Sequence, residues 1–223
     1  MNTKTNYELG LQVHQHLLDK GVETPLSLLN IPADEKVQKL QHLFTEVMQT
    51  LGLDLTDDSL ADTPRRVAKM YVHEIFQGLD YANFPKCTTV ENKMRYDEMV
   101  IERKVNVQSQ CEHHLITISG LATVAYIPKE KVLGLSKINR VVEFFAKRPQ
   151  IQERLTEQVY HALSFILDTE DVAVLIEAEH FCVKARGIKD VGSSTVTSKL
   201  GGIFKTRPEV RAEFINIARS TNV

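Results

Sequence analysis

Two short runs of cysteine and histidine carry the clearest chemical signal in this chain. The first is CEHH, from Cys111 to His114, and the second is HFC, from His180 to Cys182. Thiolates and imidazole nitrogens are ligands that zinc prefers, and a catalytic zinc keeps one coordination position free for water. Cys111 and His114 are spaced so that one turn can fold them around an ion. His180 and Cys182 would point to the same face of a predicted strand.

The residues alone do not decide between a metal site and ordinary packing. A single cysteine on a strand is usually a small buried apolar residue, and the spacing matches no zinc finger. Two clusters that each mix cysteine with histidine are harder to explain in this way. The pattern is therefore compatible with either interpretation. The third cysteine, Cys87, stands alone and is expected to be structural.

Basic residues gather at the starts of predicted helices and directly after HFC. Positive charge in a first helical turn is unfavourable against the helix dipole, whereas exposed amides beside a lysine bind anions readily. The pattern favours an anionic ligand, although solvated charge is the simpler explanation for any single residue. The residues are Ser136 (as N-cap), Lys137 and Arg140 in GLSKINR, Arg65, Arg66 and Lys69 in TPRRVAK, and Lys184 and Arg186 in KARG.

The elements that must position these residues divide the chain into two parts. Apolar residues in helical spacing predict helices over residues 7–20, 34–51 and 63–78. Alternating apolar and polar residues then predict a strand over 99–107, with one face exposed to water. Later segments predict a hairpin over 115–127 that turns at Ser119-Gly120, a strand over 172–183, and helices over 136–147, 151–167 and 208–220.

These elements predict an α+β protein. We expect a helical N-terminal region over residues 1–95 and a second, α+β domain over residues 96–223.

Composition argues against several classes of protein. The 223 residues carry a net charge of −2, so the chain as a whole has no electrostatic attraction to nucleic acid. No stretch approaches the roughly 20 apolar residues of a membrane span. Three cysteines do not make a disulfide framework, and the first ten residues do not form a signal peptide. We therefore expect a cytoplasmic protein.

Several ordered segments together resemble bacterial GTP cyclohydrolase I. They are CEHH, HFCVKARGIKD, DTPRRVAKMYVHEIFQGLDYANFP and YIPKEKVLGLSKINRVVEFFAKRPQIQERLT. The resemblance extends from about residue 35 to the C-terminus. It implies the tunnelling fold, an antiparallel sheet backed by helices, and the conversion of GTP and water to formate and dihydroneopterin triphosphate, the first step of folate biosynthesis.

The resemblance also implies a metal centre. Cys111, His114 and Cys182 would hold one zinc per chain, and three protein ligands with an open position describe a catalytic zinc. Such a zinc lowers the pKa of water, which the attack on carbon 8 of guanine requires. His113 and His180 would be catalytic and deliver protons during ring opening, because imidazole titrates near neutral pH.

The remaining implied roles concern the substrate and the assembly. Glu153 would accept hydrogen bonds from guanine, and the adjacent Gln152 would also bind the substrate. The triphosphate would be bound by Ser136, Lys137, Arg140, Arg186, Arg66 and Lys69. The resemblance further implies a homo-oligomer, a decamer of two pentameric rings, with active sites shared between subunits.

Two other functions remain open on the sequence. A related tunnelling-fold enzyme of the deazaguanine nitrile reductase type would also bind a purine-like ring through a glutamate. It uses a nucleophilic cysteine and a nicotinamide cofactor rather than zinc, which the paired Cys and His clusters disfavour. A zinc-stabilised binding module without catalysis would need a fourth ligand, which His113 or His180 could supply.

Overall fold

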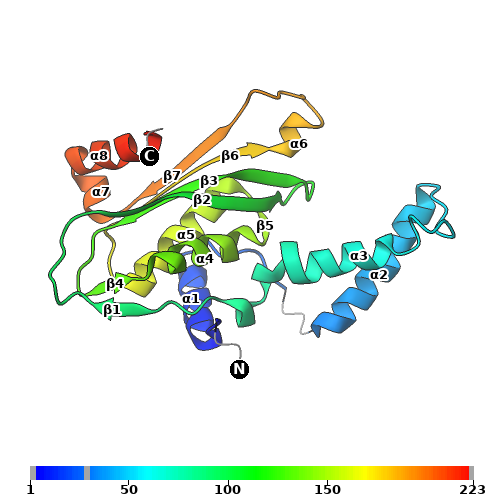
Figure 1. Cartoon of the computed structure of the whole chain (residues 1–223), viewed down its shortest axis with the longest axis horizontal. Coiled ribbons are helices and arrows are strands. Elements are labelled where there is room, and N and C mark those ends of the chain that lie inside the picture. Colours follow the sequence, from blue (N-terminus) through cyan, green and yellow to red (C-terminus); the bar gives the residue numbers. More distant parts are fainter. Residues whose placement is uncertain (1–3, 28–30, 221–223) are drawn as a thin grey trace.

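The computed structural model describes residues 4–27 and 31–220 (Figure 1). The helices are α1 (Tyr7–Asp19), α2 (Ala33–Thr50), α3 (Thr63–Met70), α4 (Leu135–Ala146), α5 (Gln152–Leu167), α6 (Phe181–Lys184), α7 (Gly202–Thr206) and α8 (Pro208–Arg219). The strands are β1 (Thr89–Glu91), β2 (Val100–Cys111), β3 (Thr117–Tyr126), β4 (Lys131–Leu133), β5 (Pro149–Gln150), β6 (Val172–His180) and β7 (Thr195–Leu200). A π-helical turn (Tyr71–Ile75) and two 3-10 turns (Gln77–Leu79 and Tyr81–Asn83) follow α3.

A five-stranded sheet in the order β5-β2-β3-β6-β7 forms the centre of the molecule. The pairs β2–β3, β3–β6 and β6–β7 are antiparallel, and the two-residue β5 runs parallel to β2. Strands β1 and β4 form a separate antiparallel ribbon. The expectation of an α+β protein is confirmed.

The expected hairpin at Ser119-Gly120 is wrong, because residues 117–126 form one continuous strand, β3. Gly120 pairs with Val107 on one side and with Ala178 on the other. A β-carbon at this position would lie 2.2 Å from the backbone oxygen of Glu177. Glycine is therefore required for the close approach of β6, not for a turn. The hairpin instead joins β2 to β3 through residues 112–116.

Helices α4 and α5 cover one face of the sheet, and α1 packs on the outer side of α5. Every second residue of β3 faces these helices, for example Ala122 and Val124, which are fully buried. Val13 and Leu17 of α1 belong to the same apolar core. The N-terminal helix thus shares the core of the later elements, and a domain boundary near residue 95 stays a prediction.

Part of the opposite face is covered by α7 and α8. Ala125, Ala173 and Leu175 pack there against Phe204 and Phe214.

A buried arginine between α4 and β5 links these elements to the segment that follows α1. The side chain of Arg148 is fully buried and contacts Glu23 at 2.7 Å. Its guanidinium lies 4.8 Å from the ring centres of Tyr81, Phe144 and Phe145. Because a buried charge is costly without a partner, this ion pair and its aromatic surroundings hold the start of β5 in place.

Helices α2 and α3 pack against each other and form an arm that extends from the rest of the molecule (Figure 1). The expected helices over residues 7–20, 34–51, 136–147, 151–167 and 208–220 are confirmed within one or two residues at each end. The third expected helix changes at Tyr71 from α-helix into the π-helical and 3-10 turns. Among the described residues, no helix combines the length and apolar character that crossing a membrane requires.

Candidate metal centre and surrounding site

The ends of β2 and β6 bring the two cysteine–histidine runs together. One potential ligand atom from each of Cys111, His114 and Cys182 lies within 4.8 Å of the other two. Cys111 is the last residue of β2, and the turn after it is closed by a hydrogen bond of 2.8 Å from Leu115 N to Cys111 O. Leu115 has a φ of 52°, a left-handed conformation that is unusual for leucine and often marks functional turns.

The three side chains fit a zinc ion. Two sulfurs and one imidazole nitrogen are a known donor set of catalytic zinc sites. With metal–ligand bonds of about 2.0–2.3 Å, ligand atoms around one ion lie roughly 3–4 Å apart. A group within 4.8 Å therefore needs only small side-chain adjustments to bind.

The expected strand over residues 172–183 ends early, at His180. Residues 181–184 form the short helix α6, so His180 and Cys182 do not share a strand face. The turn of this helix carries Cys182 toward Cys111. His180 remains on β6, where it pairs with Ile118 of β3.

A nearby arginine and the burial of the site set the electrostatic surroundings of the candidate ligands. Arg186 contacts His114 with 2.7 Å between a guanidinium nitrogen and Nε2. Burial raises the pKa of Cys182, and the neighbouring Cys111 raises it further. Arg186 therefore lies at the metal centre, as its position after HFC indicated.

The first turn of α5 faces the same centre. The buried side chain of Gln152 contacts His180, with 2.8 Å between Oε1 and Nε2. Glu153 is exposed, and its negative charge raises the pKa of His180, while burial lowers that pKa by more. Glu153 thus lies near enough to His180 for its charge to act on the imidazole.

Two residues that the sequence analysis missed hold the CEHH turn. Arg154 of α5 forms an ion pair with Glu112 at 2.5 Å. The backbone nitrogen of Glu112 donates to Gln150 O of β5 at 3.0 Å. The position of Glu112 inside CEHH could have marked it as a residue of the site. Nothing in the sequence indicates that Arg154 is its partner.

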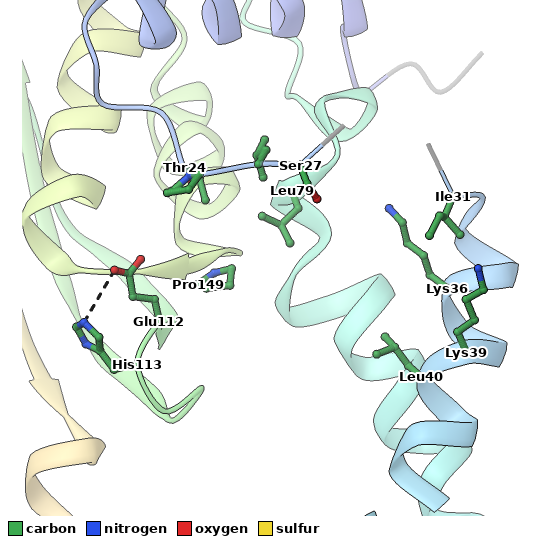
Figure 2. Close-up of a pocket in the computed structure, with 12 residues that line it drawn as sticks. Thr24, Ser27, Ile31, Lys36, Lys39, Leu40, Leu79, Glu112, His113 and Pro149 are labelled. Atoms are coloured by element: carbon green, nitrogen blue, oxygen red, sulfur yellow. Dashed lines mark ion pairs between the residues drawn. The ribbon is translucent and has the colours of Figure 1, made fainter. Parts of the chain in front are cut away.

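A cavity of about 780 Å³ opens beside this turn (Figure 2). Glu112 and His113 lie on one side of it, and Lys36 and Lys39 of α2 lie across from them. The carboxylate of Glu112 is 4.0 Å from Nε2 of His113, and Nδ1 of His113 is 3.7 Å from the sulfur of Cys111. His113 therefore borders both the metal centre and a space large enough for a nucleotide-sized molecule.

Ser136, Lys137 and Arg140 lie away from this centre in the same chain. Helix α4 starts beside β4, where Leu133 N donates to the hydroxyl of Tyr126 at 3.0 Å. Tyr126 pairs with Val100, the first residue of β2, whereas Cys111 is the last. Since the twelve-residue α4 spans about 18 Å, its first turn is well separated from Cys111.

The predicted N-cap at Ser136 is wrong. Gly134 occupies that position, no side chain caps the helix, and Ser136 lies inside the first turn. Cys87 lies close to this turn: burial raises the pKa of its thiol to about 12, and the charges of Lys137 and Arg140 act in the opposite direction.

Arg66 and Lys69 lie on α3, in the arm. Asp62, which precedes α3, pairs with Arg65 at 2.6 Å and with Arg66 at 3.0 Å. These hydrogen bonds lower the pKa of Asp62 to about 2. Asp62 therefore offsets part of the positive charge at this helix start, and Arg65 and Arg66 already have an acidic partner within the chain.

Comparison with known proteins places this arrangement in a family. Residues 40–219 match the family model of GTP cyclohydrolase I. A GTP cyclohydrolase 1 of Yersinia enterocolitica is 59% identical over 207 residues, which are 93% of this chain and 94% of the relative. One from Yersinia pseudotuberculosis gives the same identity and coverage. One from Shewanella baltica is 56% identical over 209 residues, 94% of this chain and 97% of the relative. The chain belongs to the GTP cyclohydrolase I family.

Proposed function

We propose that this chain is a GTP cyclohydrolase I that converts GTP and water to formate and dihydroneopterin triphosphate at a zinc centre. The observation that carries the proposal is the Cys111, His114 and Cys182 cluster at the ends of two sheet strands, in a chain of this family. When bound there, zinc would lower the pKa of water and so make it a nucleophile near neutral pH. One zinc per chain is the proposed content.

The two remaining histidines of the runs are the proposed proton carriers. His113 is 65% exposed and borders the cavity, so its imidazole is accessible to a substrate. His180 is partly buried and held by Gln152. Opening the imidazole ring of guanine requires protons on its nitrogens, and an imidazole side chain is a common general acid and base in enzymes.

Glu153 is the proposed reader of the base. Its carboxylate stands exposed in the first turn of α5, beside His180. A carboxylate accepts two parallel hydrogen bonds from the ring N–H and the exocyclic amine of guanine, a donor pair that adenine does not present.

The triphosphate is assigned to Ser136, Lys137, Arg140, Arg186, Arg66 and Lys69. Of these, Arg186 lies at the metal centre of the same chain, Arg66 and Lys69 lie on the arm, and the three residues of α4 lie toward the other end of the sheet. A single chain thus leaves the α4 residues well separated from its own zinc ligands. We infer that the active site is completed between subunits of a homo-oligomer, and the family resemblance indicates a decamer of two pentameric rings.

Exposed apolar residues support such an assembly. Leu43, Val47 and Leu51 on the arm are half exposed or more, which is unfavourable for a helix that faces only water. The three cysteines are free, which agrees with the proposed cytoplasmic location.

The proposal is tested by coupling metal analysis to product analysis. Purified protein is expected to contain about one zinc per chain and to release formate and dihydroneopterin triphosphate from GTP in equal amounts. Protein that holds zinc yet leaves GTP intact would favour the binding module. Reduction of a deazaguanine nitrile with a nicotinamide cofactor, without zinc, would favour the reductase.

A further inference from the structure

The side chain of Gln152 is occupied entirely within the protein. It is 1% exposed, and its amide nitrogen lies 3.0 Å from Ile176 O, 2.9 Å from Thr195 O and 3.1 Å from the hydroxyl of Thr197. These partners belong to β6 and β7. The amide is therefore held by the sheet, and it is not free to contact a nucleotide as the sequence analysis expected.

The surroundings of the amide fix which of its ends is oxygen. Ile176 O and Thr195 O are backbone carbonyls and only accept hydrogen bonds. The NH2 group must face them, because the opposite orientation would place the amide oxygen against two other oxygens. The amide oxygen then faces His180, 2.8 Å from Nε2.

This orientation determines the tautomer of His180. An amide oxygen can only accept, so Nε2 of His180 must carry a hydrogen and donate it. In the neutral ring Nδ1 is then the atom with the free lone pair. Within the described part of the chain, Nδ1 makes no hydrogen bond.

We propose that Gln152 is a positioning residue that fixes the orientation of the His180 ring and its Nε2–H tautomer, so that the Nδ1 edge is the one presented to the substrate. The inference rests on the proposed function, in which His180 acts on the substrate. The Asp of a serine-protease triad orients its histidine in the same manner.

A double-mutant cycle tests this role. Gln152→Leu keeps a side chain of similar volume and removes the acceptor, so kcat for GTP is expected to fall about tenfold or more while KM and zinc content stay near the parent values. His180→Ala is expected to lower kcat about a hundredfold. Adding Gln152→Leu to His180→Ala should then cause no further loss, because Gln152 acts only through the imidazole.

Matched variants separate positioning from packing. The hydroxyl of Thr156 donates to the backbone oxygen of Gln152 at 2.9 Å and lies 2.7 Å from the hydroxyl of Thr197. Among the described residues, it forms no hydrogen bond with His180. Thr156→Val should therefore leave kcat unchanged. Thr197→Val removes one of the three acceptors of the amide and should lower kcat less than Gln152→Leu does. It also serves as the test if Gln152→Leu does not assemble.

The outcomes distinguish this inference from the proposed function. Equal losses from Gln152→Leu in the parent and in His180→Ala would overturn the positioning role and show a general structural effect. Unchanged kcat in both Gln152→Leu and Thr197→Val would also overturn it. Unchanged turnover in His180→Ala would instead remove His180 from the proposed mechanism.

Discussion

The two ends of the central sheet differ in how much of a site one chain assembles there. At the end where β2 and β6 finish, three candidate metal ligands, two histidines and Glu153 come together. Buried hydrogen bonds and ion pairs fix their supports: Gln152 is tied to β6 and β7, and Arg154 holds Glu112. A metal and proton carriers need defined positions, and this end supplies them within one fold.

At the end where α4 begins, the chain presents positively charged side chains that few hydrogen bonds or ion pairs hold in place. Lys137 and Arg140 stand in the first turns of a helix whose N-terminus no side chain caps. Among the described residues, the one cluster of potential metal ligands found is at the other end. Phosphate binding by lysine depends on charge more than on exact geometry. The contrast supports the proposal that one chain supplies the metal ligands and proton carriers while another copy supplies the phosphate ligands.

The metal end should fail completely when one ligand is removed. Changing Cys111, His114 or Cys182 to alanine is expected to lose zinc and to lower turnover by about a hundredfold or more, because three ligands leave no redundancy. Elemental analysis and GTP turnover on the same preparation measure both effects. Cys87→Ala is the matched control. Cys87 lies outside the cluster, so this variant protein should keep its zinc. A Cys182→Ala protein with stoichiometric zinc would refute the ligand set.

The histidine beside the cavity should affect rate without affecting metal. We expect His113→Ala to lower kcat about a hundredfold while zinc remains bound. His42 is a suitable control, because it is exposed on the arm and its change to alanine should not alter turnover. Loss of zinc from His113→Ala would point to a fourth ligand and hence to a structural site.

The cysteine–histidine runs could be recognised from sequence as candidate metal ligands, because only a few residue types bind zinc. Cys111 and Cys182 stand 71 positions apart, and residue types alone left their pairing open until the family resemblance assigned both to one metal. The helices were predictable for a similar reason, since apolar spacing records which face is buried. The resemblance to a family added the roles of single residues, which spacing does not contain.

What could not be predicted depends on partners that are distant in the chain. Gly120 was taken for a turn because the sequence does not show the close backbone of β6. Gln152 was taken for a substrate contact because its acceptors on β6 and β7 come 24 and 43 residues later. The basic residues at the start of α3 were taken as a sign of an anionic ligand, and their ion pairs with Asp62, the residue just before the helix, were overlooked. Local sequence shows which hydrogen bonds or ion pairs a side chain could make, and tertiary packing determines which of them it makes.

Mixing experiments test whether the two ends belong to one site. Lys137→Ala/Arg140→Ala carries its lesion at the α4 end and Cys111→Ala carries its lesion at the metal end. If each site draws these ends from different subunits, random reassembly of equal amounts should yield intact sites in about a quarter of cases. Activity is measured after dissociation and reassembly of the mixture.

A second mixture provides the control for that test. Cys111→Ala and Cys182→Ala both damage the metal end, so no chain in their mixture has the complete ligand set and no activity should return. Absence of recovery in the first mixture, in oligomers shown to contain both chains, would mean that each chain completes its own site.

The smallest effects should distinguish base recognition from phosphate binding. Glu153→Gln removes the charge that accepts from the guanine edge, so activity with GTP is expected to fall about tenfold to a hundredfold, which corresponds to one or two charge-assisted hydrogen bonds. Inhibition by inorganic triphosphate, which has no base, should be almost unchanged.

Lys137→Ala removes one phosphate contact and should raise KM about tenfold. That factor should be similar for GTP and for ITP, which lacks the exocyclic amine, because a phosphate contact does not sense the base. Steady-state kinetics with both nucleotides measure the difference. A Lys137→Ala enzyme with altered preference between GTP and ITP would place the α4 end beside the base, and the separation of the two ends into chemical and electrostatic halves would then be wrong.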